Sequence, residues 1–150
     1  MGEKIMDKKR ILLLLIVTLG LIASLGSVSA FLGSGESVDV GGTSFYIPDG
    51  YTLNSSKYED SIYTNMYDNG LSGISILVYP DAPFTNEQFR MYEEDAGYIT
   101  YDASIGGYSG FEFVGDDGIT SFCFEKDGAS IIIMATPDLD FETTVEEIIG

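Results

Sequence analysis

Short runs of alternating apolar and polar residues, separated by glycine-rich turns, make up most of the chain after residue 36. This alternation is typical of strands, because successive side chains of a strand point to opposite faces of a sheet. Gly41-Gly42 and Asp68-Asn69-Gly70 each separate two such runs and predict hairpins. The Ser- and Asn-rich segment 51–60 is expected to be a loop. The predicted strands are 37–40, 43–47, 61–67, 71–79, 98–104, 108–114, 119–126 and 129–136.

Two segments show helical rather than strand periodicity. Thr85 and Gln88 fit a capping box, and Gly97 is well placed to end the helix that they begin. Near the C-terminus, Asp138 or Asp140 can cap a second helix. Its apolar positions recur at the spacing of one helical face: Phe141, Val145, Ile148 and Ile149.

The order of these elements predicts an α+β fold, with an antiparallel β-sheet of about six to eight strands and two helices packed on it. The segment Ser130–Met134 is apolar on both faces and is expected to be a central strand. A hydrophobic N-terminal helix is expected to precede this domain.

The N-terminus has the pattern of an export signal. Four cations lie within the first ten residues, the apolar run Ile11–Ile22 follows, and Val28 and Ala30 suit the −3 and −1 positions of a cleavage site. Residues 11–30 are also long enough for an uncleaved membrane anchor. Both interpretations place the rest of the chain outside the cytoplasm. We therefore divide the chain into a signal peptide or anchor (1–30), a spacer (31–36) and an extracytoplasmic domain (37–150).

Composition narrows the chemistry of that domain. The formal net charge is −17, but from residue 31 onward 3 cations face 22 carboxylates, which gives 3 − 22 = −19. Nucleic acid is an unfavourable partner for so acidic a chain. The absence of His excludes His-dependent triads and imidazole metal sites, and we predict no catalytic residue, no metal site and no cofactor.

Tyrosines at alternate positions of the early strands are the best candidates for a binding surface. Tyr46, Tyr63, Tyr67 and Tyr79 could form an aromatic face for a sugar or a peptide. The alternative is that they pack in the core, because Tyr favours strands.

Other candidate sites have a structural explanation as well as a functional one. Cys123 is expected to be a buried structural thiol. The acidic turns at Asp68-Asn69-Gly70, 115–118 and 127–128 suit tight turns, with weak calcium binding as the alternative. The run Glu93-Glu94-Asp95 is expected to be a solvated helix face, although anions there could also bind cations.

Three segments resemble small secreted proteins of methanogenic archaea. Phe45–Tyr51 matches their Phe-x-Ile-Pro-x-Gly-Tyr motif, 122–133 resembles their Phe-x-Phe-x-Lys-x-Gly-x-x-Ile strand pair, and 145–149 resembles their closing helix. The element order is also similar to the PsbP-like fold. Because that secreted family is functionally uncharacterised, the resemblance implies location and fold but carries over no site residues.

We therefore expect a non-catalytic extracytoplasmic domain, secreted or membrane-tethered, that binds a protein or polysaccharide at the cell surface or acts in assembly. If uncleaved, residues 11–30 would make the membrane a further partner. The alternatives are a carboxylate-based hydrolase of surface polymers, which needs two convergent carboxylates in a cleft, and a weak calcium-binding module.

Overall fold

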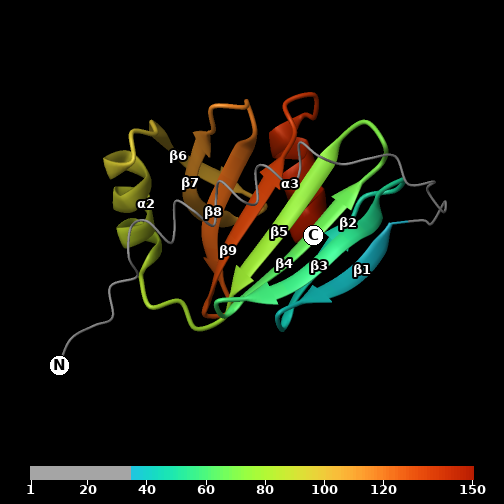
Figure 1. Ribbon diagram of the computed structural model, residues 1–150, viewed down its shortest axis with the longest axis horizontal. Coiled ribbons are helices and arrows are strands. Elements are labelled where there is room, and N and C mark those ends of the chain that lie inside the picture. The colour runs from blue at the N-terminus through green and yellow to red at the C-terminus, as the bar shows by residue number, and fades with distance from the viewer. Residues whose placement is uncertain (1–34) are drawn as a thin grey trace.

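The computed structural model describes residues 35–150, which fold around a seven-stranded antiparallel sheet (Figure 1). The predicted hydrophobic N-terminal helix lies outside the described residues. A two-stranded sheet and two helices complete the α+β architecture that the sequence predicts. In spatial order the large sheet contains β3 (Thr52–Glu59), β4 (Ile62–Asp68), β5 (Gly73–Tyr79), β9 (Ala129–Ala135), β8 (Thr120–Lys126), β7 (Tyr108–Val114) and β6 (Thr100–Ile105). The remaining elements are β1 (Glu36–Val40), β2 (Thr43–Ile47), α2 (Asn86–Asp95) and α3 (Phe141–Ile149).

The strand β9 is the centre of the sheet, as its two apolar faces predict. It pairs with β5 on one side and β8 on the other. Ile131 and Ile133 belong to the core on one face, and Met134 belongs to the core on the other face. All three side chains are fully buried.

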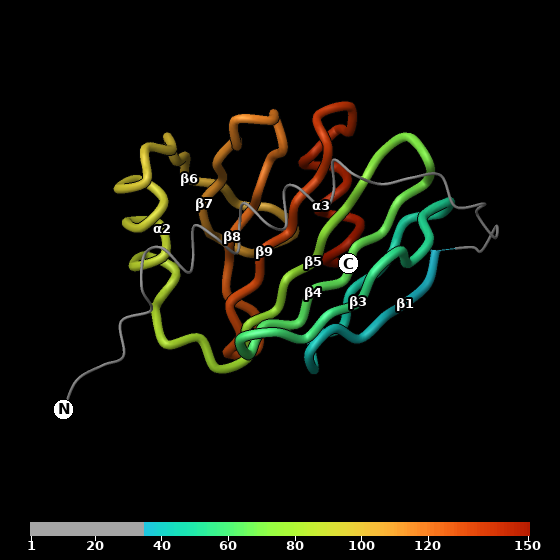
Figure 2. Tube along the Cα trace, viewed as in Figure 1, coloured from blue at the N-terminus to red at the C-terminus, as the bar shows by residue number. Residues whose placement is uncertain are grey.

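The prediction of a loop over residues 51–60 is wrong, because residues 52–59 form β3 at one edge of the sheet. Figure 2 shows β3 and β6 at opposite edges. An edge strand has one neighbour and remains largely exposed, so polar residues such as Ser55 and Ser56 are compatible with it. The pairing of β3 with β4 contains one irregularity, between Leu53 and Ser55.

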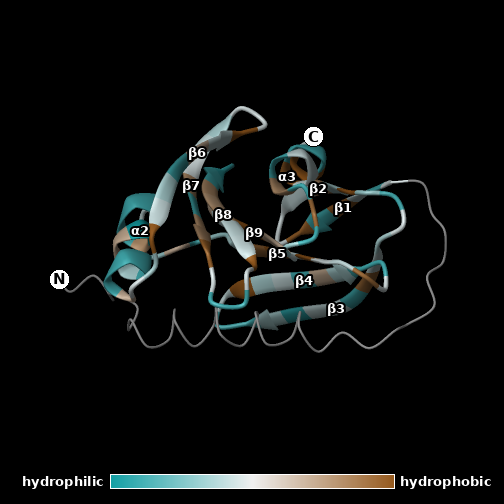
Figure 3. Ribbon diagram, turned by 90° about the horizontal axis from the view of Figure 1, so that it is seen from above, coloured by the Kyte–Doolittle hydropathy of each residue, from teal (hydrophilic) through white to brown (hydrophobic). Residues whose placement is uncertain are grey.

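One face of the large sheet is covered by the β1–β2 hairpin and α3 (Figure 3). The strand β1 lies against β4 and β5, and α3 contacts β2 and β6. Phe45 and Ile47 of β2, together with Val145 and Ile148 of α3, join the sheet residues in one apolar core. This core contains sixteen buried residues and holds the hairpin in place.

The other face carries α2, which contacts β6 and β8. Phe89 of the helix packs on Phe111 of β7, with ring centroids 5.8 Å apart. The helix begins at the predicted capping box, in which Thr85 accepts from the Gln88 amide and the Gln88 side chain accepts from the Thr85 amide. Gly97 follows the end of the helix with φ of 103°, which favours glycine.

The last helix is capped by Asp140 rather than Asp138. The Asp140 side chain accepts from the Thr143 amide at 3.2 Å. Within residues 35–150, no helix has the length and apolar character that crossing a bilayer requires.

Gly110 of β7 lies where the backbone of the neighbouring strand β8 approaches closely. A methyl group at this position would collide with the backbone carbonyl oxygen of Cys123 on β8. We expect Gly110→Ala to lower the free energy of unfolding by about 2–4 kcal/mol, because the backbone must move. Urea denaturation measures this loss. The neighbouring exposed substitution Ser109→Ala serves as the control, and equal stability of the two variants would contradict the predicted collision.

Candidate functional site

The structure does not bring the four predicted binding tyrosines together on one surface. Tyr46 is exposed on β2, and Tyr63 is partly exposed on β4. Because Tyr63 lies opposite Val78, the next residue, Tyr79, points to the other face of the sheet. The prediction that Tyr46, Tyr63, Tyr67 and Tyr79 form one aromatic face is therefore wrong.

Tyr67 belongs to the core on the α3 side of the sheet. It is 4% exposed, and its hydroxyl accepts a hydrogen bond from Asn65 Nδ2 at 3.0 Å. Burial raises the pKa of Tyr67 above its ordinary value. This tyrosine stabilises the fold and is not accessible to a ligand.

The most exposed aromatic pair lies at the β3 edge and includes a residue that the sequence analysis missed. Tyr58 of β3 lies directly opposite Tyr63 of β4, and their ring centroids are 4.4 Å apart. Tyr58 is 62% exposed and Tyr63 is 37% exposed. Leu53, opposite Tyr67, is on the same face of β3 and is 54% exposed. We call the contacting pair Tyr58 and Tyr63 the edge cluster.

The β1–β2 turn fixes the position of the Tyr63 ring. A Cβ atom on Gly41 would lie 2.6 Å from Tyr63 Cδ2, so only glycine allows the turn to approach the ring so closely. Gly41 also has φ of 59°, which favours glycine. The turn therefore supports the edge cluster from the side of the small sheet.

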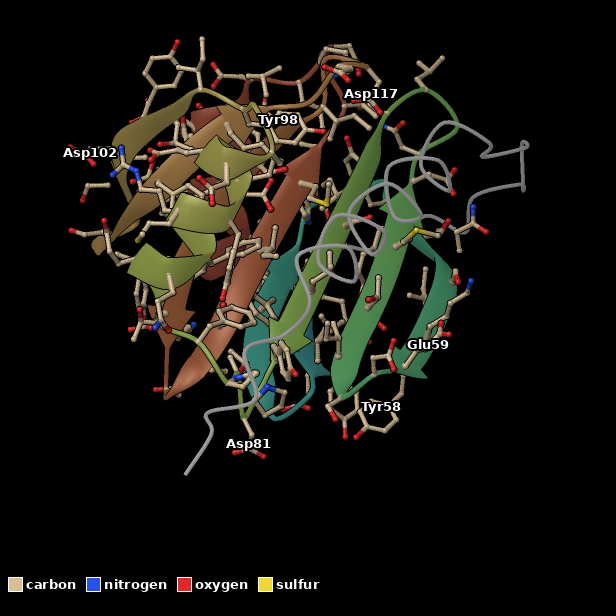
Figure 4. The ribbon with its side chains drawn as sticks, turned by 60° about the vertical axis from the view of Figure 1, so that its left-hand side comes forward. Tyr58, Glu59, Asp81, Tyr98, Asp102 and Asp117 are labelled. Atoms are coloured by element: carbon tan, nitrogen blue, oxygen red, sulfur yellow. The ribbon has the colours of Figure 1, made fainter. Side chains whose placement is uncertain are left out.

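Two consecutive carboxylates lie at the C-terminal end of β3. Glu59 is the last residue of the strand, and Asp60 forms the turn that follows with φ of 51°. Figure 4 shows Tyr58, Glu59 and Asp81 towards the same end of the sheet, whereas Tyr98 and Asp117 lie towards the opposite end. Lys57 is the only cation of β3.

The other two cations of the described domain are engaged elsewhere. Arg90 forms ion pairs with Glu94 at 3.2 Å and with Asp102, near β6. Lys126 lies over the rings of Phe45 and Tyr108 and donates to the Ser44 carbonyl oxygen. The excess negative charge near the edge cluster is therefore not neutralised by these two side chains.

The acidic run at the end of α2 is exposed at Glu94 and Asp95, as expected, but the expectation of a solvated face is wrong for Glu93. Its side chain is 1% exposed, and its Oε2 atom has no hydrogen-bond partner. Burial raises the pKa of Glu93 to about 7. The sequence contained a signal for this burial, because Glu93 follows the core residue Phe89 by one helical turn.

Cys123 is buried on the same side of the sheet, which confirms the expected structural thiol. Burial raises the pKa of Cys123 well above its ordinary value, and the nearby Glu93 carboxylate raises it further. A thiol with a raised pKa is a poor nucleophile and a poor metal ligand. This pair therefore gives no support to covalent chemistry.

A set of hydrogen bonds joins the β4–β5 connection to the segment before α3. Ser72 donates a hydrogen bond to Asp138, and Thr136 accepts one from the Gly73 amide at 3.0 Å. Hydrogen bonds from Ser72 and Thr136 lower the pKa of Asp138. Because a lowered pKa makes the carboxylate a weaker base, the group holds two loops together and is poorly suited to activate Ser72.

The acidic turns use their carboxylate and amide oxygens to close the backbone. Asp68 accepts from the Gly70 amide, and Asn69 accepts from the amides of Leu71 and Ser72. Asp117 accepts from the Ile119 amide. Across residues 35–150, no group of three or more Asp, Glu or Cys side chains is arranged to hold a metal ion.

The fold and these sites define a small acidic α+β domain with an exposed aromatic edge strand. No protein-family model matches the chain, and no curated protein is significantly similar to it.

The buried Glu93 predicts a specific pH dependence of stability. The pKa of Glu93 is about 7 in the folded state, against an ordinary value of 4.5. Between pH 4.5 and pH 7, the Glu93 carboxyl group therefore keeps its proton in the folded state but loses it in the unfolded state. The contribution of the protonated Glu93 to the free energy of unfolding is fully present below about pH 4.5 and is lost as the pH rises towards and through 7. We expect Glu93→Gln to stabilise the domain by about 3 kcal/mol at pH 8 and by little at pH 4.

Urea denaturation across this pH range measures the difference. Glu87→Gln on the exposed side of the same helix is the control and should keep the wild-type pH dependence. A constant offset between Glu93→Gln and wild type at every pH would contradict the assignment.

Burial of Cys123 also predicts the reactivity of the thiol. We expect negligible labelling by iodoacetamide at pH 8 in the native protein and rapid labelling in urea, because the thiolate is both disfavoured and inaccessible. Mass spectrometry measures the rates. Native labelling at the rate of the unfolded protein would show that Cys123 is reactive.

Proposed function

We propose that this chain is a non-catalytic extracytoplasmic domain, secreted or membrane-tethered, that acts in surface binding or assembly. The observation that carries the proposal is the order along the sequence. A basic segment and the apolar run Ile11–Ile22 precede a domain whose first strand begins at Glu36, just beyond the predicted cleavage site after Ala30.

Two properties of the folded domain support a binding role over catalysis. The exposed edge cluster offers rigid aromatic area at the margin of the sheet, where a partner has access. By contrast, burial raises the pKa values of Glu93 and Cys123, and neither side chain is accessible to a substrate. The pKa of Asp138 is lowered by hydrogen bonds that hold two loops of the domain together.

The domain's charge also suits an exterior location. With 3 cations and 22 carboxylates after residue 31, it is strongly solvated and repels copies of itself. The resemblance of Phe45–Tyr51 to secreted archaeal proteins agrees with this location.

Export is tested by expressing the full chain with a C-terminal tag in a bacterial host and treating intact spheroplasts with protease. We expect the tag to be digested, because the cations before the apolar run stay in the cytoplasm. Replacing Lys8, Lys9 and Arg10 by Glu should protect a substantial fraction of the tag. Intact mass then separates cleavage after Ala30 from a retained anchor, and a tag fully protected in the unaltered chain would overturn the proposal.

A further inference from the structure

We propose that the outer edge of β3 pairs with an extended, Lys- or Arg-containing segment of a partner protein, which adds an eighth strand to the sheet. This inference specifies the partner of the surface-binding role and rests on that proposed function. It is carried by three properties of β3: its position, its exposed Tyr58 and its charge.

The position leaves one side of the strand open. Among the described residues, β3 pairs only with β4, so the backbone groups on its outer side face no further strand of the sheet. An added strand can satisfy such groups with a ladder of hydrogen bonds. The irregularity between Leu53 and Ser55 interrupts the pairing of β3 with β4. The regularly paired residues Ser55–Glu59 are therefore the favoured docking segment.

The opposite edge is less suitable because its side chains are already committed. On β6, Thr100 accepts a hydrogen bond from Arg90 Nε at 2.7 Å, and Asp102 pairs with the same guanidinium. These contacts tie β6 to α2. On β3, Thr52 and Asn54 donate hydrogen bonds to Asp68 of the neighbouring strand β4. Among the described residues, no side chain of Ser55–Glu59 is tied to a helix by a hydrogen bond or an ion pair, which makes this part of β3 the better candidate.

The exposed Tyr58 supplies an anchor for the partner's side chains. Tyr58 is already held against Tyr63 at 4.4 Å, and the Tyr63 ring is fixed by the turn at Gly41. A large aromatic side chain that is partly ordered before binding loses little conformational freedom when a partner covers it. Side chains of an added strand that point to this face would contact Tyr58.

Charge selects a basic partner over a second copy of the chain. Glu59 is the last residue of the docking segment Ser55–Glu59, and Asp60 follows it. Lys57 is the only cation of the strand. Two copies would bring together domains of formal charge −19 each, whereas a Lys- or Arg-containing strand gains attraction at the same edge. Lys57 also disfavours indiscriminate edge pairing, as charged residues do on natural edge strands.

The probe is an acetylated synthetic peptide that matches the eight residues of β3 in length and alternates Lys with Val and Tyr. With the domain 31–150, we expect micromolar binding by fluorescence anisotropy that weakens as salt rises. Hydrogen exchange should show new protection of amides within Ser55–Glu59, because the added strand orders that edge. The same peptide with alternate amides N-methylated lacks the ladder donors and should not bind.

Matched tyrosines on the two edge strands test the anchor. Tyr58→Ser should weaken peptide binding about tenfold. Tyr101→Ser, on β6 and with a similar exposed fraction of 59% against 62%, should change it less than about twofold. Thermal unfolding of the unliganded variants checks that both remain folded.

Other outcomes would overturn the inference. Equal binding of a peptide with Glu in place of Lys would contradict the basic partner, and protection at β6 instead of β3 would contradict the edge. Protection of Ser55–Glu59 that grows with protein concentration without peptide would show a second copy as the occupant. Absence of binding at millimolar peptide would reject this edge while leaving the export result, and hence the proposed function, intact.

Discussion

Burial of β9 on both faces is the constraint on which the other layers of the domain depend. A strand with Ile131 and Ile133 on one side and Met134 on the other is stable only if both sides of the sheet are covered. The β1–β2 hairpin and α3 supply one cover, and α2 packs on the other side. The strands β5 and β8 complete the buried centre, so exposure increases towards β3 and β6. A surface that binds partners is therefore expected at the margins of the sheet rather than at its centre.

Local sequence patterns predict most of the elements because their signals are short-range. Thr85 and Gln88 specify the start of α2 through contacts within one helical turn, and Ser130–Met134 indicates a central strand by its composition alone. The strand β3 was missed because its exposed edge position removes the apolar alternation that identifies a strand. Its pairing with β4 stabilises polar residues that would otherwise favour a loop.

The side-chain environment of the candidate sites is harder to predict, because it depends on contacts between distant segments. Whether Tyr63 and Tyr79 share a surface is decided by the register between β4 and β5, in which a shift of one residue reverses the face. The burial of Glu93 similarly requires the sheet beneath α2. Helical spacing from Phe89 indicates the correct face, but the acidic neighbours Glu94 and Asp95 suggest solvent.

The polarity of β3 conceals the strand in the sequence and also suits its proposed role. A strongly apolar strand at an edge would invite aggregation, so an exposed edge remains soluble only when most of its residues are polar or charged. In β3 the serines and Lys57 meet this requirement, while the edge cluster keeps a limited apolar contact around Tyr58. Hydrogen bonding by the backbone does not depend on side-chain polarity, so the strand can remain soluble and still accept a partner. Selectivity then comes from the two features that vary along the strand, the aromatic ring of Tyr58 and the carboxylates at Glu59 and Asp60.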